Sequence, residues 1–227
     1  MITLAIDTCL DACSVALFDC AEGTVLGGRH GPMARGHAEH LLPFADEVLE
    51  MAGLSPAEIG KVIVTRGPGT FTGVRVGLSA ARALAIGSRV EVGAISSLHA
   101  LALCAVGGGG RELPIAAVID ARRDELYVAT FSCEGKPLTP PAIISASAGA
   151  DSLPEERYQA VGSGAATLAA SDGRFQVAQP LALPDARTWG PRAAGLPEFL
   201  EEPVPLYLRK PDAKPPSADA QVSLAPG

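Results

Sequence analysis

Short apolar runs rich in β-forming residues alternate with helical spacing along the first half of the chain. The runs predict strands at Ile2–Asp7, Ser14–Asp19, Thr24–Arg29, Lys61–Thr65 and Glu91–Ile95. Spacing near 3.6 residues predicts helices at His37–Ala52, about Thr72–Ile86, and Ser97–Ala105. Three strands followed by alternating helices and strands indicate a mixed sheet with helices on both faces.

Four consecutive glycines, Gly107–Gly110, mark the expected boundary between two lobes, 1–106 and 107–209. Beyond them the pattern predicts a hairpin pair, an edge strand and an interrupted helix, at Pro114–Asp120 with Glu125–Ser132, at Ala142–Ser145, and within Ala186–Glu202. No internal repeat is visible by eye, although the two lobes could be distant copies. Residues 210–227 are rich in proline and alanine without periodicity, which predicts a disordered tail.

Composition fits a layered α/β protein. Of the 227 residues 48% are hydrophobic but only 4% aromatic, and 25 glycines and 19 prolines supply turns. A formal charge of -7 excludes a general attraction to a nucleic-acid backbone. The five cysteines contain no CxxC pair, which indicates free thiols in a reducing compartment. With no basic leader and no bilayer-length apolar run, we expect a cytoplasmic protein without membrane contact.

The stretch RGPGTFTGVRVGL, from Arg66 to Leu78, is a glycine-rich loop that leads into a helix. A phosphate loop requires GK[ST], but Val74 follows Gly73, and the glycine spacing does not match GxGxxG. The alternative is a tight strand-to-helix turn, with Thr72 as the N-cap and glycines permitting unusual dihedral angles. An exposed helix N-terminus can also accept an anion, so this alternative stays open at the sequence level.

The two long helices carry more apolar surface than one packed face requires. The second is apolar around most of its circumference and is predicted to be buried nearly all round, except for a strip of Arg75, Ser79 and Arg82. Those arginines need carboxylates or phosphates, either within the chain or on a partner. The first helix is apolar over about half its circumference. Together the helices form either a partner surface or a face covered by the chain itself.

Candidate catalytic groups are sparse. His37 and His40 are spaced at i and i+3, which does not define a zinc pair; His30 is expected in a loop and His99 in the core. No GxSxG elbow is present. Asp7, at the end of the first strand, is the best single carboxylate.

Five segments then carry a family resemblance: AIDTC, HAEHLLP, RGPGTFTGVRVGL, VIDARRDELY and PVPLYLR. In these the chain resembles the TsaB (YeaZ) family from its N-terminus to about Arg209. The resemblance implies an α/β fold of two RNase H-like lobes of the actin/Hsp70/sugar-kinase (ASKHA) superfold, with the second lobe reduced. It also implies a part in making threonylcarbamoyladenosine beside the anticodon of tRNAs that read codons starting with A.

The resemblance implies an accessory subunit. TsaD would carry out the transfer, the ATPase TsaE would join the pair, a homodimer is possible, and tRNA would be reached through the complex. The chain itself would hold no catalytic residue, cofactor or metal, while its partners use ATP and a metal ion. Leu41 stands where the second metal-binding histidine of TsaD would fall. The turn of Asp7 and Thr8 lacks the glycine of a phosphate loop, which implies a vestigial nucleotide site.

The resemblance also implies which residues contact partners. We expect the docking face at His37, Leu41, Phe44, Ala45, Val48, Arg75, Leu78, Ser79 and Arg82. The family loop, Gly67, Pro68, Gly69, Thr70, Phe71, Thr72 and Gly73, is then a rigid turn that launches a docking helix. Two enzymatic alternatives are a metallopeptidase and a small-molecule kinase of the same superfold. A third, non-enzymatic alternative is an ATP-sensing protein.

Overall fold

The computed structural model describes residues 1–88, 90–106, 113–147, 153–154, 157–177 and 181–209. The first lobe is built on a five-stranded sheet in the order β3-β2-β1-β4-β5. Its strands are β1 (Ile2–Asp7), β2 (Ala12–Asp19), β3 (Thr24–Pro32), β4 (Lys61–Thr65) and β5 (Glu91–Ile95). β1, β2 and β3 pair antiparallel, whereas β4 and β5 continue the sheet in parallel. The predicted mixed sheet is confirmed.

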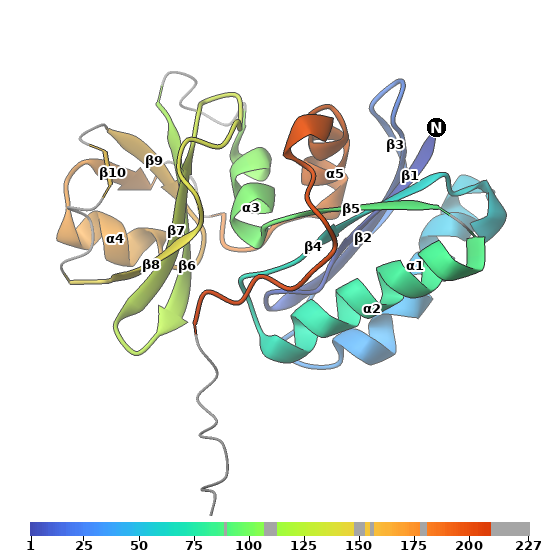
Figure 1. The fold of residues 1–227 in the computed structure, drawn as a ribbon, viewed down its shortest axis with the longest axis horizontal. Coiled ribbons are helices and arrows are strands. Elements are labelled where there is room, and N and C mark those ends of the chain that lie inside the picture. The colour runs from blue at the N-terminus through green and yellow to red at the C-terminus, as the bar shows by residue number, and fades with distance from the viewer. Residues whose placement is uncertain (89, 107–112, 148–152, 155–156, 178–180, 210–227) are drawn as a thin grey trace, which may run out of the picture.

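The alternation of side chains along these strands gives the sheet two buried faces. One face, with Leu4, Ile6 and Val15, packs against helices α1 (His37–Ala52) and α2 (Phe71–Ser88). The opposite face, with Ala5, Ala16 and Phe18, packs against α5 (Ala186–Ala194), as Figure 1 shows. The central strands β1, β2 and β4 therefore need apolar residues at successive positions, whereas the edge strand β3 has no buried residue.

The second lobe repeats the topology of the first. Its sheet has the order β10-β9-β6-β7-β8. The strands are β6 (Ile115–Arg122), β7 (Glu125–Phe131), β8 (Ala142–Ser145), β9 (Tyr158–Val161) and β10 (Phe175–Val177). β6 occupies the place of β1: it pairs antiparallel with β7, which pairs antiparallel with β8, and parallel with β9, which pairs parallel with β10. Between β9 and β10 lies only the short helix α4 (Ala165–Ser171), so this lobe is the smaller copy. The predicted superfold with a reduced second lobe is confirmed.

Each lobe sends the helix that follows its sheet across to the other. Helix α3 (Ser97–Ala105) follows β5 and packs on β6 and β7, while α5 follows β10 and packs on β1, β2 and β3. The expected second lobe, 107–209, was therefore too long. From α5 onward the chain returns to the first lobe through the 3-10 turn Pro197–Phe199 and the bridge between Glu201 and Ala94.

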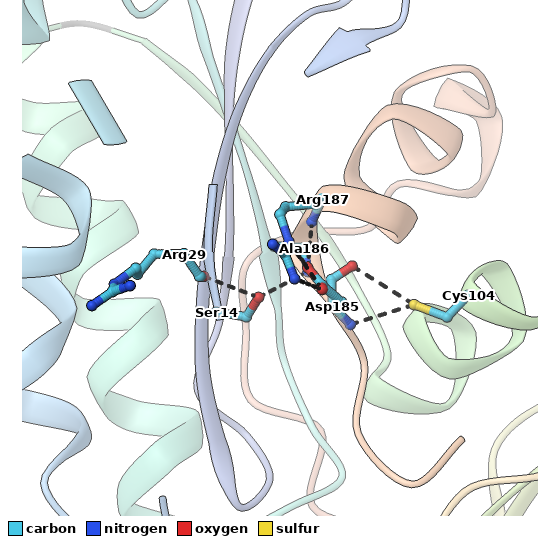
Figure 2. A network of polar contacts seen from close by, with 6 residues as sticks. All are labelled: Ser14, Arg29, Cys104, Asp185, Ala186 and Arg187. Atoms are coloured by element: carbon cyan, nitrogen blue, oxygen red, sulfur yellow. Dashed lines mark hydrogen bonds and ion pairs between the residues drawn. The ribbon is translucent and has the colours of Figure 1, made fainter. Parts of the chain in front are cut away.

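The start of α5 is fixed to the first sheet by a polar network shown in Figure 2. Ser14 of β2 accepts a hydrogen bond from the backbone N–H of Ala186 at 2.9 Å. Asp185 caps the helix by accepting from the Arg187 backbone N–H at 2.9 Å, and its own N–H contacts the Cys104 sulfur of α3 at 3.4 Å. This network joins β2, α3 and α5, which belong to three distant parts of the sequence.

Several local predictions need correction. Helix α2 begins at Phe71, and Thr70 rather than Thr72 caps it, because the Thr70 hydroxyl accepts from the Gly73 backbone N–H at 3.1 Å. α2 is buried on one face rather than all round, since alanines on its outer side raise apolarity without being covered. His30 lies inside β3, not in a loop. The long C-terminal helix is only Ala186–Ala194.

Two further expectations lie outside the described residues: the break at the four glycines and the tail 210–227. A short 3-10 turn, Pro56–Glu58, precedes β4. Among the helices of the described part, none is both long and apolar enough to cross a bilayer.

Candidate functional site

The glycine loop packs directly against the turn that follows β1. Thr70 donates its backbone N–H to the Cys9 carbonyl at 2.8 Å, and the Thr8 hydroxyl donates to the Gly73 carbonyl at 2.7 Å. A Cβ at Gly69 would lie 2.2 Å from the Cys9 carbonyl oxygen, and one at Gly73 would lie 2.0 Å from that of Thr8. The glycines are therefore required by close backbone approach. The glycine loop packs on one side of the β1 turn, while Leu10 and Asp11 of the turn and Gly69 and Thr70 of the loop also line a cavity between the lobes.

Asp7 is fully buried beneath this contact, which corrects its assignment as a nucleotide-site residue. Its Oδ1 accepts from the Thr65 hydroxyl at 2.5 Å and from the Cys9 backbone N–H at 3.0 Å. Its Oδ2 is buried and has no hydrogen-bond partner among the described residues. Burial is the largest influence on Asp7 and raises its pKa above 3.8. Asp7 and Thr8 thus hold the loop from inside and do not face a ligand.

The cysteine and histidine candidates are likewise engaged in structure. Burial, with the nearby Asp7 carboxylate, raises the pKa of the Cys9 thiol to about 12, so it is no nucleophile at neutral pH. The His37 ring contacts the Leu10 carbonyl at 2.8 Å, and His40 contacts the Gly36 carbonyl at 3.1 Å. Within the described residues no group of three or more potential ligands could hold a metal ion.

His99 is a core residue, as expected from its apolar surroundings. Its Nε2 contacts the Gly135 carbonyl at 2.9 Å, and its ring stacks on Phe131 with centroids 5.0 Å apart. Burial lowers the pKa of His99 to about 4, so the ring is neutral at pH 7.

A cavity of about 460 Å³ lies between the two lobes. The turn after β1 contributes Leu10 and Asp11, and the hairpin that joins β6 to β7 contributes Asp120 and Arg122. Arg209, near the end of the described chain, completes one wall. The cavity is bounded by both lobes, so its shape depends on how they are held together.

A larger apolar groove, of about 800 Å³, runs along the outer side of α1 and α2. Its lining residues are mainly small or aliphatic: Ala38, Leu41, Leu42, Phe71, Thr72, Arg75, Val76, Ser79, Ala80, Ala83, Leu84 and Gly87. Leu42 and Phe71 are 60% and 55% exposed, although both are large apolar side chains. An exposed apolar groove of this kind is typical of a surface that another protein covers.

The structure changes which residues can form this face. His37, Phe44, Val48 and Leu78 are buried in the core, so they support the helices and are not available to a partner. Leu41 is 2% exposed and lies at the floor of the groove. Ala45 is half-buried, whereas Arg75, Ser79 and Arg82 are exposed as the strip predicted. Sequence reasoning missed Leu42, whose position on the helix wheel lies outside the buried stripe.

The two arginines of the strip find neutral partners. Arg75 donates to the Tyr207 hydroxyl at 3.3 Å and its guanidinium lies 3.6 Å from the Phe71 ring centroid. Arg82 donates to the Pro203 carbonyl at 2.6 Å. Among the described residues no carboxylate forms an ion pair with Arg75 or Arg82, and pairing with a carboxylate on a partner stays a prediction.

Two lobes of equal strand order, joined by crossed helices, define a two-lobed α/β protein of the predicted fold class, with the glycine loop packed on the turn after β1. Comparison with known proteins gives the family. A model described as "TsaD: tRNA N6-adenosine threonylcarbamoyltransferase" matches residues 31–180. The chain belongs to the TsaB (YeaZ) family.

Individual relatives agree with this assignment. The solved structure of YeaZ from Pseudomonas aeruginosa is similar at 30% identity and a TM-score of 0.75, covering 91% of this chain and 99% of that one. An uncharacterized protein of Mycobacterium tuberculosis is 35% identical over 93% of each chain. The "tRNA threonylcarbamoyladenosine biosynthesis protein TsaB" of Escherichia coli is 40% identical over 56% of this chain and 54% of its own length.

Proposed function

We propose that this chain is a non-catalytic subunit that binds and activates a TsaD-type threonylcarbamoyltransferase. The product would be threonylcarbamoyladenosine beside the anticodon of tRNAs that read codons starting with A. TsaE would join the complex, and ATP and a metal ion would act on the partner proteins. The observation that carries the proposal is the exposed apolar groove on α1 and α2, in a chain of the TsaB family.

The chemistry of the groove favours a protein partner of the same fold. Half of its lining residues are alanine or leucine, and the small side chains among the lining residues let two helix pairs approach closely. The family model that matches this chain carries the name TsaD, so such a partner would present an equivalent helix pair. Arg75 and Arg82 rest on neutral oxygens and keep an uncompensated positive charge for acidic side chains on that partner.

The packing around the turn after β1 supports an accessory role. The turn after β1, where a phosphate loop would be expected in this superfold, is hydrogen-bonded to the glycine loop through Thr70 and Gly73 and lacks a phosphate-loop glycine of its own. Asp7 points into the core and accepts bonds from Thr65 and Cys9. A subunit of this form would contribute a surface and leave the group transfer to its partner.

Reconstitution tests the function. The purified chain, its matching TsaD and TsaE, a threonylcarbamoyl-adenylate source, ATP and unmodified tRNA are combined, and modified adenosine is counted with each protein omitted in turn. We expect no product without this chain and none from this chain alone. Product from the chain alone, or full activity in its absence, would contradict the proposal.

The groove is tested by a matched pair of substitutions on α1. Leu42→Asp places a charge in the groove, and we expect affinity for TsaD to fall at least about tenfold, because one buried charge costs more than 1.4 kcal/mol. Met51→Asp is the control, since Met51 is 59% exposed on the same helix but does not line the groove. Calorimetric titration measures both affinities. Equal affinities for the two variants would place the docking surface elsewhere.

A further inference from the structure

Residues Glu201–Arg209 form an extended segment, here called the strap, that runs between the two lobes (Figure 1). Its first residue pairs with β5, since Glu201 and Ala94 exchange backbone hydrogen bonds of 2.7 and 2.8 Å. Arg66, just after β4, then holds the strap in two ways. Its side chain forms an ion pair with Glu201, and its backbone carbonyl accepts a hydrogen bond from the Leu206 N–H at 2.8 Å. The strap therefore crosses the first lobe beside the glycine loop.

The middle of the strap is fixed to α2. The Pro203 carbonyl accepts from Arg82 at 2.6 Å, and the Tyr207 hydroxyl accepts from Arg75 at 3.3 Å. The Tyr207 ring stacks on Phe71 with centroids 5.6 Å apart. Phe71 and Arg75 also line the groove on α1 and α2. The same two side chains thus face the docking groove and hold the strap.

The far end of the strap reaches the second lobe. Arg209 forms an ion pair with Glu125 of β7 and donates to the Arg122 carbonyl of β6 at 3.4 Å. Arg122 and Arg209 both line the cavity between the lobes. One short segment therefore connects the groove to this cavity.

The turn that Arg209 contacts is conformationally unusual. Arg122, Arg123 and Asp124 have φ values of 62°, 58° and 59°, the left-handed region that residues with a Cβ seldom adopt. Three such residues in a row persist only where surrounding contacts hold them. The Asp124 carbonyl accepts a hydrogen bond from the Ala146 backbone N–H, and the Arg122 carbonyl accepts one from Arg209 of the strap. The strap is therefore one of several contacts that hold this turn, together with the bonds from Ser147 to the Asp124 carboxylate and from the Arg122 N–H to Asp120.

We propose that the strap couples the groove to this turn, so that a protein bound on α1 and α2 stabilises the strap and thereby pins the turn at the cavity between the lobes. The part concerning a bound partner rests on the proposed function; the link between Tyr207 and the turn does not. An occupant that packs on Phe71 and Arg75 restrains the groups that hold Tyr207, and Tyr207 is two residues from Arg209. By thermodynamic reciprocity, loosening the strap at Arg209 must weaken binding at the groove.

The first test needs no partner. Hydrogen exchange is followed by mass spectrometry in the unmodified chain and in Tyr207→Ala, which removes the stack on Phe71 and the bond from Arg75. We expect peptides covering the turn 122–124 to exchange at least about fivefold faster in the variant. Lys61→Gln is the control for the loss of a surface contact away from the strap, because it breaks the ion pair between Lys61 and Glu91. Unchanged exchange at the turn in Tyr207→Ala would overturn the link.

The second test adds TsaD. We expect binding to slow exchange at the turn in the unmodified chain, to lose this effect in Arg209→Ala, and to regain part of it in Arg209→Lys. Affinity for TsaD should fall about fivefold in Arg209→Ala, although Arg209 does not line the groove. Equal protection in Arg209→Ala would refute coupling through the strap. Failure of the unmodified chain to bind TsaD would refute the proposed function and the coupling to a partner, while the first test still decides the internal link.

Discussion

Gly69 and Gly73 occupy positions that have no room for a side chain. A Cβ on either would approach a backbone oxygen of the β1 turn to 2.2 or 2.0 Å. Neither residue has a positive φ among the described glycines, so the constraint is contact rather than dihedral angle. A glycine loop before a helix therefore serves close packing here, although the same pattern serves phosphate binding in other proteins.

Gly69→Ala should lower the free energy of unfolding by about 3 kcal/mol, because the backbone of the β1 turn must move to admit the methyl group. Gly87→Ala is the matched control on α2, where a Cβ meets nothing within 4 Å. The control should gain about 0.5–1 kcal/mol, as glycine is unfavourable inside a helix. Urea unfolding followed by circular dichroism measures both. Equal stabilities would show that the loop contact is looser than the structure indicates.

Asp7 makes stability depend on pH. Its folded-state pKa lies above the ordinary value of 3.8, so protonation is favoured by folding. The stabilising contribution is fully present below pH 3.8 and is lost as the pH rises through the folded-state pKa. Asp7→Asn stays neutral, and its stability relative to the unmodified chain should rise by about 1.4 kcal/mol per pH unit across that window.

Urea titrations at a series of pH values above 4 measure the Asp7→Asn effect. Asp46→Asn, which removes an exposed carboxylate on α1, is measured alongside as the control for the loss of one acidic side chain. A curve for Asp7→Asn that runs parallel to that of the unmodified chain would mean that the Asp7 carboxylate is ionised without cost inside the fold.

At the scale of elements, local pattern predicted the strands of the first lobe and the hairpin of the second. It did not predict β9, α4 or β10. Val62, Ile63 and Val64 sit in a run that only a buried strand accommodates. The prediction that helix α2 is buried nearly all round was wrong, because Ala80, Ala83 and Ala85 count as apolar although their small side chains do not need to be buried. The equivalence of the loops after β4 and β9 was not predicted either. Gly67 and Gly162 have similar φ values, 99° and 105°, but the sequences around them differ.

Helix α5 shows what local pattern cannot give. Periodicity says that a helix has an apolar face but not which sheet it covers, and here Trp189 and Gly190 pack on the first lobe, beside Phe18. Helices α1 and α2 were predicted, but five of the nine residues expected on the partner face are buried: His37, Leu41, Phe44, Val48 and Leu78. The strip of Arg75, Ser79 and Arg82 was predicted to differ from the apolar faces of its helix; its contacts with the strap join residues far apart in sequence.

Ser14→Ala tests the attachment of α5. The substitution leaves the buried Ala186 N–H without its acceptor and should cost about 1–3 kcal/mol. Ser147→Ala, at an exposed position in the second lobe, should change stability by less than about 0.5 kcal/mol. Thermal and urea unfolding measure both variants. A loss as small as that of Ser147→Ala would mean that water replaces Ser14 at the start of α5.

At the scale of the whole molecule, the two lobes complete each other. The face of the first sheet with Ala5, Phe18 and Ile63 is covered by a helix that arrives from the end of the second lobe. A fragment 1–106 therefore lacks α5 and leaves this face without its main cover. Such an apolar face exposed to water favours aggregation or a loosely packed state.

We expect the fragment 1–106 to unfold without a cooperative transition and to bind the dye ANS. A second fragment, with residues 107–181 replaced by a Gly/Ser linker, restores α5 and should recover cooperativity. Trp189 is the single tryptophan of the chain and is fully buried on α5, so its fluorescence reports docking directly. Its emission should shift to shorter wavelength in the second fragment, as expected for a tryptophan leaving water. Cooperative unfolding of 1–106 alone would mean that the first lobe folds without the crossing helix, and that the exchange of α3 and α5 orients the lobes rather than stabilising them.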